Sequence, residues 1–496
     1  MAVLALLVSL QVPAVAPLRT AELLATVRTL AADELGGRPA GSWEALAAAR
    51  LLAFELERAG CQPVPATRDY LLPLLLQRAV ASRPSQLTIT RAGQRTPLAL
   101  DAAFRPLPRF AVTAGTAGGA AVFVGYGIHA PDQGWDDYQG LPPEALTGRT
   151  AVLVASRPRA GLPDAPGKGQ PIVWRPGAGV AFSLDARVHE AARRGASLVV
   201  LLTDPRPQGL QACIDDSRDL TQFVPFVTET LWCTPCLPAT ARAQATPAVQ
   251  VLRLGAEPLF GGREALAARL DAMDRTGTPG SGPLADTAVT LDLHLRHEPA
   301  PAAGALGLLP GRDPQRATEF VLVTAHLDGT GRGYDRRTLH PGANDGASGC
   351  AALAALAAHF AAPEQRPRRS LVFVAWSGRD RGLLGSSAWV QEPPLPLAQT
   401  RAVVHLDGIG RAALRLPAPA AARQALADTL RDPGARIASD TLPFLERGVP
   451  ALRCDDGATP RDAKDDTAAA LDPGILDSNV QALVALVRAL ADAEER

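Results

Sequence analysis

The segment FVAWSGRDRGLLGS, residues 373–386, begins like a buried β-strand and ends like the first turn of a helix. Between the two parts stand Arg379, Asp380 and Arg381. In open α/β sheets the carboxyl ends of the strands line the ligand crevice, and a catalytic carboxylate often stands there. Two cations at the mouth of this strand therefore bear directly on what chemistry the protein can perform.

Two other apolar segments of the last third also run into an acid or a histidine. They are FVLVTAHLDG at 320–329 and AVVHLDGIG at 402–410. PGANDGASGCAALAALAAHF, at 341–360, places Asp345 in a glycine-rich turn before an Ala/Leu helix. We expect the polar side chains at these strand ends to converge: His326, Asp328, Asp345, Asp380 and Asp407.

One imidazole with several carboxylates is a ligand set suited to Zn²⁺, Co²⁺ or Mn²⁺. Taken one at a time, an Asp after a strand is an ordinary loop residue and an Asp before a helix is an ordinary cap. The combination, in this order and at these strand ends, favours a metal site.

The alternation of apolar strands and helices after residue 280 predicts an α/β fold, with a mixed, mostly parallel sheet sandwiched by helices. TAVTLDLHLRH, at 287–297, alternates with period two and predicts a half-buried strand. Upstream, an amphipathic helix is expected between an N-cap at Ser42 and a stop at Gly60, with apolar positions that include Leu52 and Phe54.

Residues 105–260 have a different sequence pattern, in which short apolar runs typical of β-strands, such as AAVFVGYGI and SLVVLLTD, alternate with loops rich in Pro, Gly and Asp. We therefore predict a smaller β-rich domain over 105–260, inserted between two parts of a larger domain at 18–104 and 261–496.

The balance of 50 Lys+Arg against 50 Asp+Glu argues against a nucleic acid or an anionic membrane as partner. No run approaches the roughly 20 apolar residues of a membrane span. AVLALLVSL at 2–10, followed by PAVA, predicts a signal peptide over 1–17 and hence an exported protein. Since no basic residue precedes this run, an ordinary N-terminal core segment remains the alternative.

Six cysteines are too few for a disulfide scaffold in a chain of 496 residues. Cys233 and Cys236 form WCTPC, but the sequence that follows lacks the helix of a thioredoxin motif. A local disulfide or an incidental pair is the interpretation we favour for them.

The motifs TAHLDG, PGANDGASG, FVAWSGRDRGLLGS, VVHLDGIG, SDTLPFLERGVPAL and DDTAAALD occur in this order. Together they resemble the co-catalytic zinc aminopeptidases, a family that includes glutamate carboxypeptidase, glutaminyl cyclase and the transferrin receptor ectodomain. LAADELGGRPAGS looks like the N-terminal segment of that family, and FVGYGIHAPDQGWDDYQGL looks like its inserted protease-associated domain. The resemblance covers most of residues 20–490.

The resemblance implies two zinc ions that share a water, as in two-metal hydrolases. It assigns His326, Asp345 and Asp407 to one ion, with Asp345 bridging to the other. Asp328 matches the acid that orients the histidine outside the ligand shell. The implied substrate or ligand is a peptide or protein.

The second ion departs from the family pattern. The Glu-Glu pair of the family falls on Arg379 and Asp380, and the late histidine ligand falls on Asp462. An all-carboxylate site suits Mg²⁺, Ca²⁺ or Mn²⁺ better than Zn²⁺, so one zinc site is expected and the second is expected to be weak or empty. Thr441 is a further departure, because the family form there is SDHxPF.

Arg379 replaces the general base of the family, which takes a proton from the metal-bound water. A guanidinium has no acceptor and stays protonated, so Arg379 cannot do this. His405, two residues before Asp407 on the same strand, or His340 could serve as a substitute ligand or base, although a supporting role is the simpler interpretation for both.

Three functions follow from these substitutions. The first is a non-catalytic pseudopeptidase that binds a peptide or protein. The second is an active exported metalloaminopeptidase with an altered base. The third, an acyltransferase of the glutaminyl-cyclase type, ranks last because that type retains the glutamate that Arg379 replaces.

Overall fold

The computed structural model describes residues 20–67, 69–100, 103–106, 114–131, 134–156, 158, 184–206, 230–233, 246–251, 257–332, 338–430, 439–457 and 464–494. The predicted signal peptide, Cys213, Cys236 and Asp462 lie outside these residues.

The larger unit is built on a six-stranded sheet with the order β1-β14-β18-β15-β19-β20. The four strands from β18 to β20 run parallel, while β14 and β1 are antiparallel to their neighbours. This confirms the predicted mixed, mostly parallel sheet. The strands are β1 (Leu71–Pro73), β14 (Ala303–Leu309), β15 (Phe320–His326), β18 (Ser370–Trp376), β19 (Thr400–Leu406) and β20 (Ala451–Cys454).

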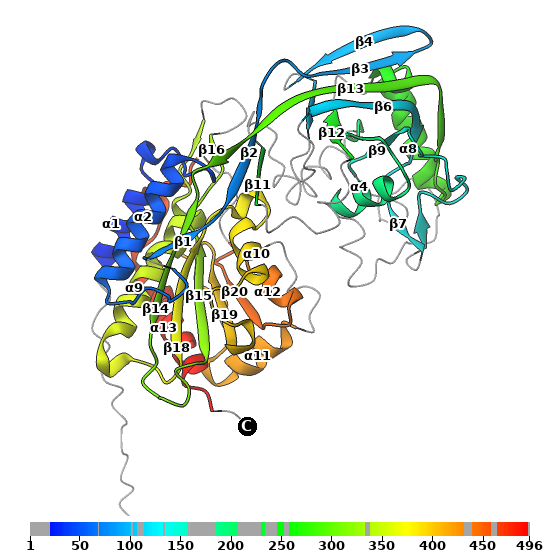
Figure 1. The fold of residues 1–496 in the computed structure, drawn as a ribbon. Helices are drawn as coiled ribbons and strands as arrows, with labels where there is room; N and C mark the ends of the chain where they lie inside the picture. The colour runs from blue at the N-terminus through cyan, green and yellow to red at the C-terminus, as the bar shows by residue number, and fades with distance from the viewer. Residues whose placement is uncertain are drawn as a thin grey trace, which may run out of the picture.

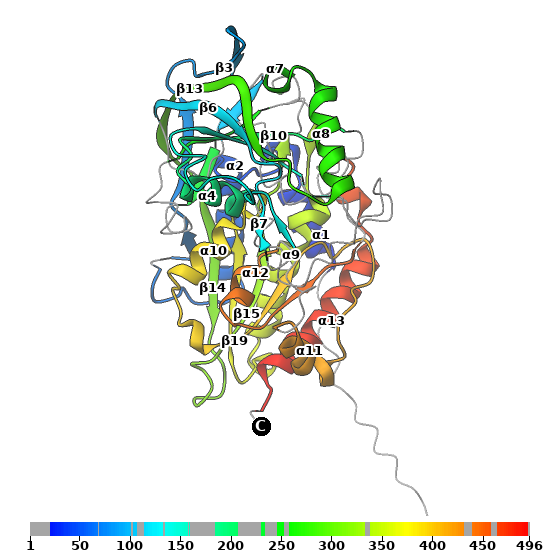
Figure 2. The same ribbon diagram turned by 90° about the vertical axis from the view of Figure 1, so that its right-hand side faces the viewer.

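Helices cover both faces of this sheet (Figures 1 and 2). One face packs on α1 (Thr20–Leu30), α2 (Trp43–Arg58), α9 (Gly349–Ala361) and α13 (Pro473–Ala491). The other face packs on α10 (Leu384–Gln391) and α12 (Leu442–Glu446). Central strands such as β15 and β18 are buried along their whole length, which explains their continuous apolar sequences. The remaining helix of this unit, α11 (Ala422–Asp428), contacts α13.

The helix predicted after Ser42 is present as α2. The Ser42 side chain accepts a hydrogen bond from the Ala45 N–H at 3.1 Å, as an N-cap does, and Gly60 follows the helix at φ 90°. Leu52 is fully buried, but the Phe54 side chain is 57% exposed and does not belong to the buried face.

The smaller unit contains most of a ten-stranded sheet with the order β11-β2-β13-β6-β9-β10-β12-β5, to which β3 and β4 add through β13. Its core packs on α4 (Leu184–Arg193) on one side and α8 (Arg263–Thr276) on the other. Short elements are α7 (Glu257–Phe260), β7 (His129–Ala130) and β8 (Trp135–Asp136). The strands of the sheet are β2 (Leu76–Ala81), β3 (Gln86–Arg91), β4 (Gln94–Ala99), β5 (Phe104–Pro106), β6 (Ala114–Phe123), β9 (Thr150–Val154), β10 (Leu198–Leu202), β11 (Thr230–Cys233), β12 (Ala248–Val251) and β13 (Gly282–Ala300).

The long strand β13 joins the two units (Figure 1). It pairs with β3 and β6 through its first part and with β2 through its last part, directly before β14 of the larger sheet. The period-two pattern predicted for this strand is confirmed, because Val289, Leu291 and Leu293 are buried while Thr290 and Asp292 are exposed.

The smaller core reaches beyond residues 105–260 on both sides. It includes Leu87 and Ile89 of β3, and Leu266, Leu270 and Met273 of α8. The identification of this unit as a protease-associated domain stays a prediction.

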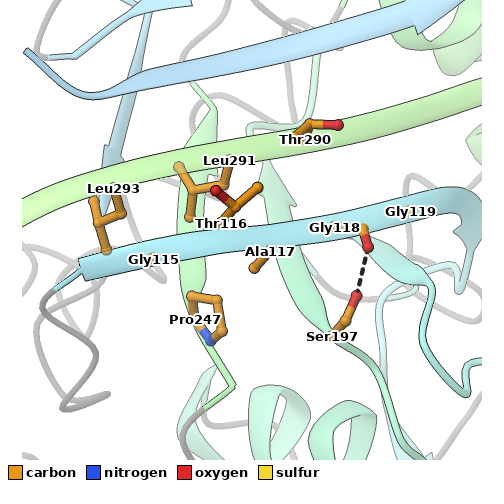
Figure 3. A pocket seen from close by; sticks show the side chains of 10 residues that line it. All are labelled: Gly115, Thr116, Ala117, Gly118, Gly119, Ser197, Pro247, Thr290, Leu291 and Leu293. Carbon is orange, nitrogen blue, oxygen red and sulfur yellow. Dashed lines mark hydrogen bonds between the residues drawn. The ribbon is translucent and has the colours of Figure 1, made fainter.

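A pocket of about 570 Å³ lies in the smaller unit, below the ribbon formed by β6 and β13 (Figure 3). Gly115–Gly119 of β6 line one wall, and Ser197 donates a hydrogen bond to the Gly118 carbonyl across it at 2.9 Å. None of the site residues expected from the sequence lines this pocket.

Among the described residues, α13 has the length and apolar composition that a membrane span requires, although half of it is buried inside the fold. Its residues Leu476, Val480, Leu483 and Val487 pack into the core of the larger unit. Helices in the core of a folded domain can have the same length and apolar composition as a membrane span.

Arg38 ties the N-terminal helices to the strand ends. Its side chain is fully buried and donates hydrogen bonds to the carbonyls of Leu327, Pro341 and Gly342 at 2.7, 2.9 and 2.9 Å. It also contacts the Leu30 carbonyl at the end of α1. One guanidinium thus joins three chain segments, two of which flank His326 and Asp345.

We expect Arg38→Met to lower the free energy of unfolding by at least about 3 kcal/mol, because it leaves several buried carbonyls without donors. Arg38→Lys keeps the charge but not the forked donor geometry, so it should recover only part of that loss. Urea unfolding of both variants, beside the solvent-exposed control Arg50→Met, measures the effect. An Arg38→Met protein as stable as the native one would contradict this role.

Asp137 is a buried carboxyl in the smaller unit. Its Oδ2 accepts hydrogen bonds from the N–H groups of Tyr126 and Ile128 at 3.1 and 2.9 Å. Burial raises the pKa of Asp137 to about 7, although these N–H groups and Arg187 favour the charged form.

Because this folded-state pKa lies above the value of about 3.9 in an unfolded chain, the stability that Asp137 contributes is complete below pH 4 and is lost as the pH rises through 7. Between pH 4 and pH 8 the free energy of unfolding of the native protein should therefore fall by on the order of 4 kcal/mol relative to Asp137→Asn. Urea unfolding of both proteins across this range checks it, and parallel pH profiles would show that Asp137 does not titrate there.

Candidate metal centre

The pairing of three parallel strands brings the predicted site residues to one edge of the sheet. β15 lies between β18 and β19, with His326 opposite Trp376 and Ala325 opposite Leu406. His326 therefore ends the central strand, while Asp407 and the turn that holds Arg379 follow its two neighbours. Figure 2 shows β15 and β19 side by side.

His326 is fully buried and faces two carboxylates. Its Nε2 lies 3.2 Å from Asp407 Oδ1 and 3.3 Å from Asp345 Oδ1. Its Nδ1 lies 2.9 Å from the main-chain oxygen of Asp328, which orients the ring. The orienting contact expected from the Asp328 carboxyl is thus made by the backbone of the same residue. The carboxyl instead accepts the Arg379 N–H at 3.3 Å, and its other oxygen has no partner among the described residues.

Asp345 lies in an irregular turn, Ala343–Ser348, that precedes α9. The turn contains Gly346 at φ 93°, a conformation that glycine adopts without strain. The Asp466 carboxylate accepts the N–H groups of both Asn344 and Asp345 at 2.9 Å and so fixes the turn. Asp466, and not the Asp345 carboxylate, therefore holds the turn. The Asp345 carboxylate faces His326 instead.

Asp407 divides its two oxygens between different partners. Oδ1 faces His326, whereas Oδ2 accepts hydrogen bonds from Arg379 Nη2 at 2.8 Å and Arg453 Nε at 2.9 Å. Burial opposes the charge on Asp407, but Arg379 above all, with His326 and Arg453, outweighs it and holds the pKa well below its ordinary value. Asp407 is therefore ionised at neutral pH and offers Oδ1 as a ligand atom.

Arg379 stands in the short 3₁₀ turn Arg379–Arg381 between β18 and α10, and its side chain is 2% exposed. Besides Asp407, Nη1 donates to Asp380 Oδ1 at 3.1 Å and lies 3.6 Å from Asp345 Oδ1. Burial lowers the pKa of Arg379, but these three carboxylates outweigh burial and raise it well above its ordinary value. Asp380 thus pairs with a guanidinium, and the structure gives no position for Asp462.

His326, Asp345 and Asp407 offer one ligand atom each within 4.8 Å of one another. Burial and Arg379 disfavour the proton on His326, but Asp345 and Asp407 prevail and raise its pKa to about 10. One imidazole and two carboxylates fit a zinc ion that keeps an open position. A bound Zn²⁺ supplies a Lewis acid that polarises a ligand carbonyl.

The two histidines considered as substitutes are not members of this trio, although the His405 ring centroid lies 6.2 Å from that of His326. His405 is fully buried, bonds through Nδ1 to Thr324 Oγ1 at 3.0 Å and has its Nε2 3.7 Å from Asp440 Oδ2. Burial drives its pKa well below the ordinary value, so it is neutral. His340 lies on β17 (Leu339–His340), which pairs with β16 (Gly331–Arg332). Neither histidine belongs to the group that could hold a metal.

Sequence reasoning missed Arg453 and assigned no role to Asp466 and Arg38. The last two stand in DDTAAALD and GGRPAGS, so the family motifs did signal them. Arg453 lies on β20 in the plain segment ALRC, where nothing in the sequence distinguishes it. Its contact with Asp407 depends on the pairing of β19 with β20.

Part of the chain is similar in sequence to a known protein family. Residues 306–487 match the sequence model described as Peptidase family M28. A probable glutamate carboxypeptidase of Arthroderma benhamiae is 27% identical over 158 residues, which are 28% of this chain and 20% of that protein. Transferrin receptor protein 2 of Homo sapiens is 33% identical over 110 residues, which are 22% of this chain and 12% of the receptor. The chain thus spans one-fifth or less of the length of these two relatives.

The fold is similar to that of a solved aminopeptidase from Aneurinibacillus sp. strain AM-1. The TM-score is 0.55 at 18% identity, and the match covers 97% of this chain and 95% of that one. Because it covers nearly all of both chains, the similarity includes the smaller unit as well as the larger sheet. The motif order, the six-stranded sheet and the match over residues 306–487 lead to one conclusion: this chain carries a domain of peptidase family M28.

Proposed function

We propose that this protein is a pseudopeptidase of family M28, which binds a peptide or protein ligand at the centre formed by His326, Asp345 and Asp407 and has little or no hydrolytic activity. The observation that carries the proposal is the buried guanidinium of Arg379, which lies among the acidic groups of the centre. Export and a protease-associated role for the smaller unit are part of the proposal and rest on the sequence alone.

Hydrolysis by a metal-bound water needs a group that accepts a proton and returns it to the leaving amine. Arg379 cannot accept one, since all its nitrogen atoms are donors and its three carboxylate neighbours stabilise the charged form. Two nearby carboxylates are already engaged: Asp380 receives the Arg379 Nη1 hydrogen bond, and both oxygens of Asp407 face other groups of the centre. Loss of a positioned general base costs on the order of 10²–10⁴ in rate.

A second candidate function is an active metalloaminopeptidase with an altered base. The close packing of His326, Asp345 and Asp407 favours it, because a single divalent ion could still bind there and polarise a carbonyl. In that case another group, such as Asp380 or a residue outside the described part of the chain, would carry the proton.

Arg379→Glu should restore the missing base and raise kcat for an aminoacyl chromogenic substrate by about 10²-fold or more over the native protein. The assay uses a broad panel of such substrates, with both proteins supplemented with Zn²⁺ and matched in thermal stability. Arg381→Glu makes the same charge change two residues away in the same turn and should gain no activity.

Efficient turnover by the native protein would overturn the pseudopeptidase proposal and favour the second candidate. A silent native protein and a silent Arg379→Glu variant of equal stability would show that Arg379 is not what separates this centre from a working one.

A further inference from the structure

The guanidinium of Arg379 contacts acidic groups that the family resemblance divides between two metal ions. Asp407 belongs with His326 to the first ion, Asp380 belongs to the second, and Asp345 bridges both. The Arg379 nitrogens lie 2.8, 3.1 and 3.6 Å from oxygens of Asp407, Asp380 and Asp345. One organic cation therefore meets all three carboxylates at once.

We propose that Arg379 is a built-in second cation, which takes the place and the charge of a second metal ion, so that the centre binds a single divalent ion. The inference rests on the metal site in the proposed function, but not on whether the protein hydrolyses peptides. A second metal site could also be weak because ligand residues are missing. Our proposal instead attributes the absence of a second ion to Arg379, whose guanidinium occupies the position of that ion.

The division of the Asp407 oxygens supports this proposal. Oδ1 faces His326 Nε2 and remains directed at the first metal position, whereas Oδ2 accepts from two guanidiniums. A carboxylate held in this way can give one oxygen to one metal ion. Asp380 likewise gives Oδ1 to Arg379.

The position of Arg379 is set by these carboxylates and not by a full set of hydrogen bonds. Its Nε is buried and has no partner among the described residues, which is unfavourable for a guanidinium. The Arg379 side chain is almost completely inaccessible to solvent. The residue before it, Gly378, has a left-handed backbone conformation with φ 86°. A Cβ at Gly378 would approach the Leu384 side chain to 2.8 Å, so the turn packs closely against the start of α10. This close packing keeps the Arg379 side chain directed toward the centre.

Arg453 is a second guanidinium at the centre, but its position does not allow it to replace a second metal ion. It contacts Oδ2 of the same Asp407 at 2.9 Å, but its other acidic neighbour is Asp455, at 3.3 Å. Its contacts with acidic groups therefore include neither Asp345 nor Asp380. Arg453 is the matched control for the charge on Asp407 alone.

The test counts Mn²⁺ ions per chain in the full-length protein, because Mn²⁺ accepts carboxylate oxygens and its electron paramagnetic resonance separates isolated ions from coupled pairs. After removal of metals with a chelator, titration calorimetry should give one Mn²⁺ per native chain with an uncoupled spectrum. Arg379→Met, which keeps the aliphatic stem, should bind two and show a coupled pair. Arg453→Met should bind one, as the native protein does.

Thermal unfolding adds a readout that does not depend on counting. Metal-free Arg379→Met leaves three carboxylates without their shared cation, so its Tm should fall below that of the metal-free native protein. Mn²⁺ should then raise the Tm of this variant by more than that of the native protein, since the ion binds only the folded state.

Two ions on the native protein, or none, would overturn the proposal whatever its activity. A single ion on a folded Arg379→Met variant would do the same. If that variant does not fold, the native stoichiometry still tests the proposal, because two ions or none would overturn it. Native turnover with one bound ion would sink the pseudopeptidase function and leave this inference standing, so the two failures are distinguishable.

Discussion

The parallel pairing of β15 with β18 on one side and β19 on the other is the constraint on which the centre depends. His326 ends the middle strand, and the two neighbouring strands deliver the Arg379 turn and Asp407 to the same edge. A shift of one residue in either pairing would turn alternate side chains to the opposite face and separate these groups. Apolar side chains on both faces of these strands pack against helices, which holds the sheet in the core of the larger unit.

The loops at this edge are held by charged groups that are not metal ligands. Asp466 anchors the turn of Asp345 through two backbone N–H groups. Arg38 binds the Leu327 carbonyl, directly after His326, and the Gly342 carbonyl ahead of Asp345. Such contacts order a site before any ion arrives, as outer-shell partners do in metalloproteins. The edge of the sheet that carries His326, Asp345 and Asp407 is therefore ordered by residues around the trio as well as by the trio itself.

Arg379 sets both the charge and the hydrogen-bonding geometry of the centre. A glutamate at the position of Arg379 would add a negative charge and a proton acceptor, whereas the guanidinium adds a positive charge and donors only. Asp345, Asp380 and Asp407 accordingly form ion pairs with the Arg379 side chain. Arg453 reinforces this change at Asp407 from a strand that carries no motif.

The sequence by itself determined the fold class and predicted the trio of His326, Asp345 and Asp407, because continuous apolar segments mark buried strands and the polar residues of the motifs follow their ends. The order of the strands around the site came from the tertiary structure. The sequence also predicted that Arg379 could not act as a base, since that follows from the side chain alone. Only the tertiary structure decided that Arg379 faces inward onto three carboxylates, that Arg453 joins it, and that the Asp328 backbone orients His326. These contacts arise between segments far apart in the chain, so they depend on strand register and turn geometry, which residue identities alone do not reveal.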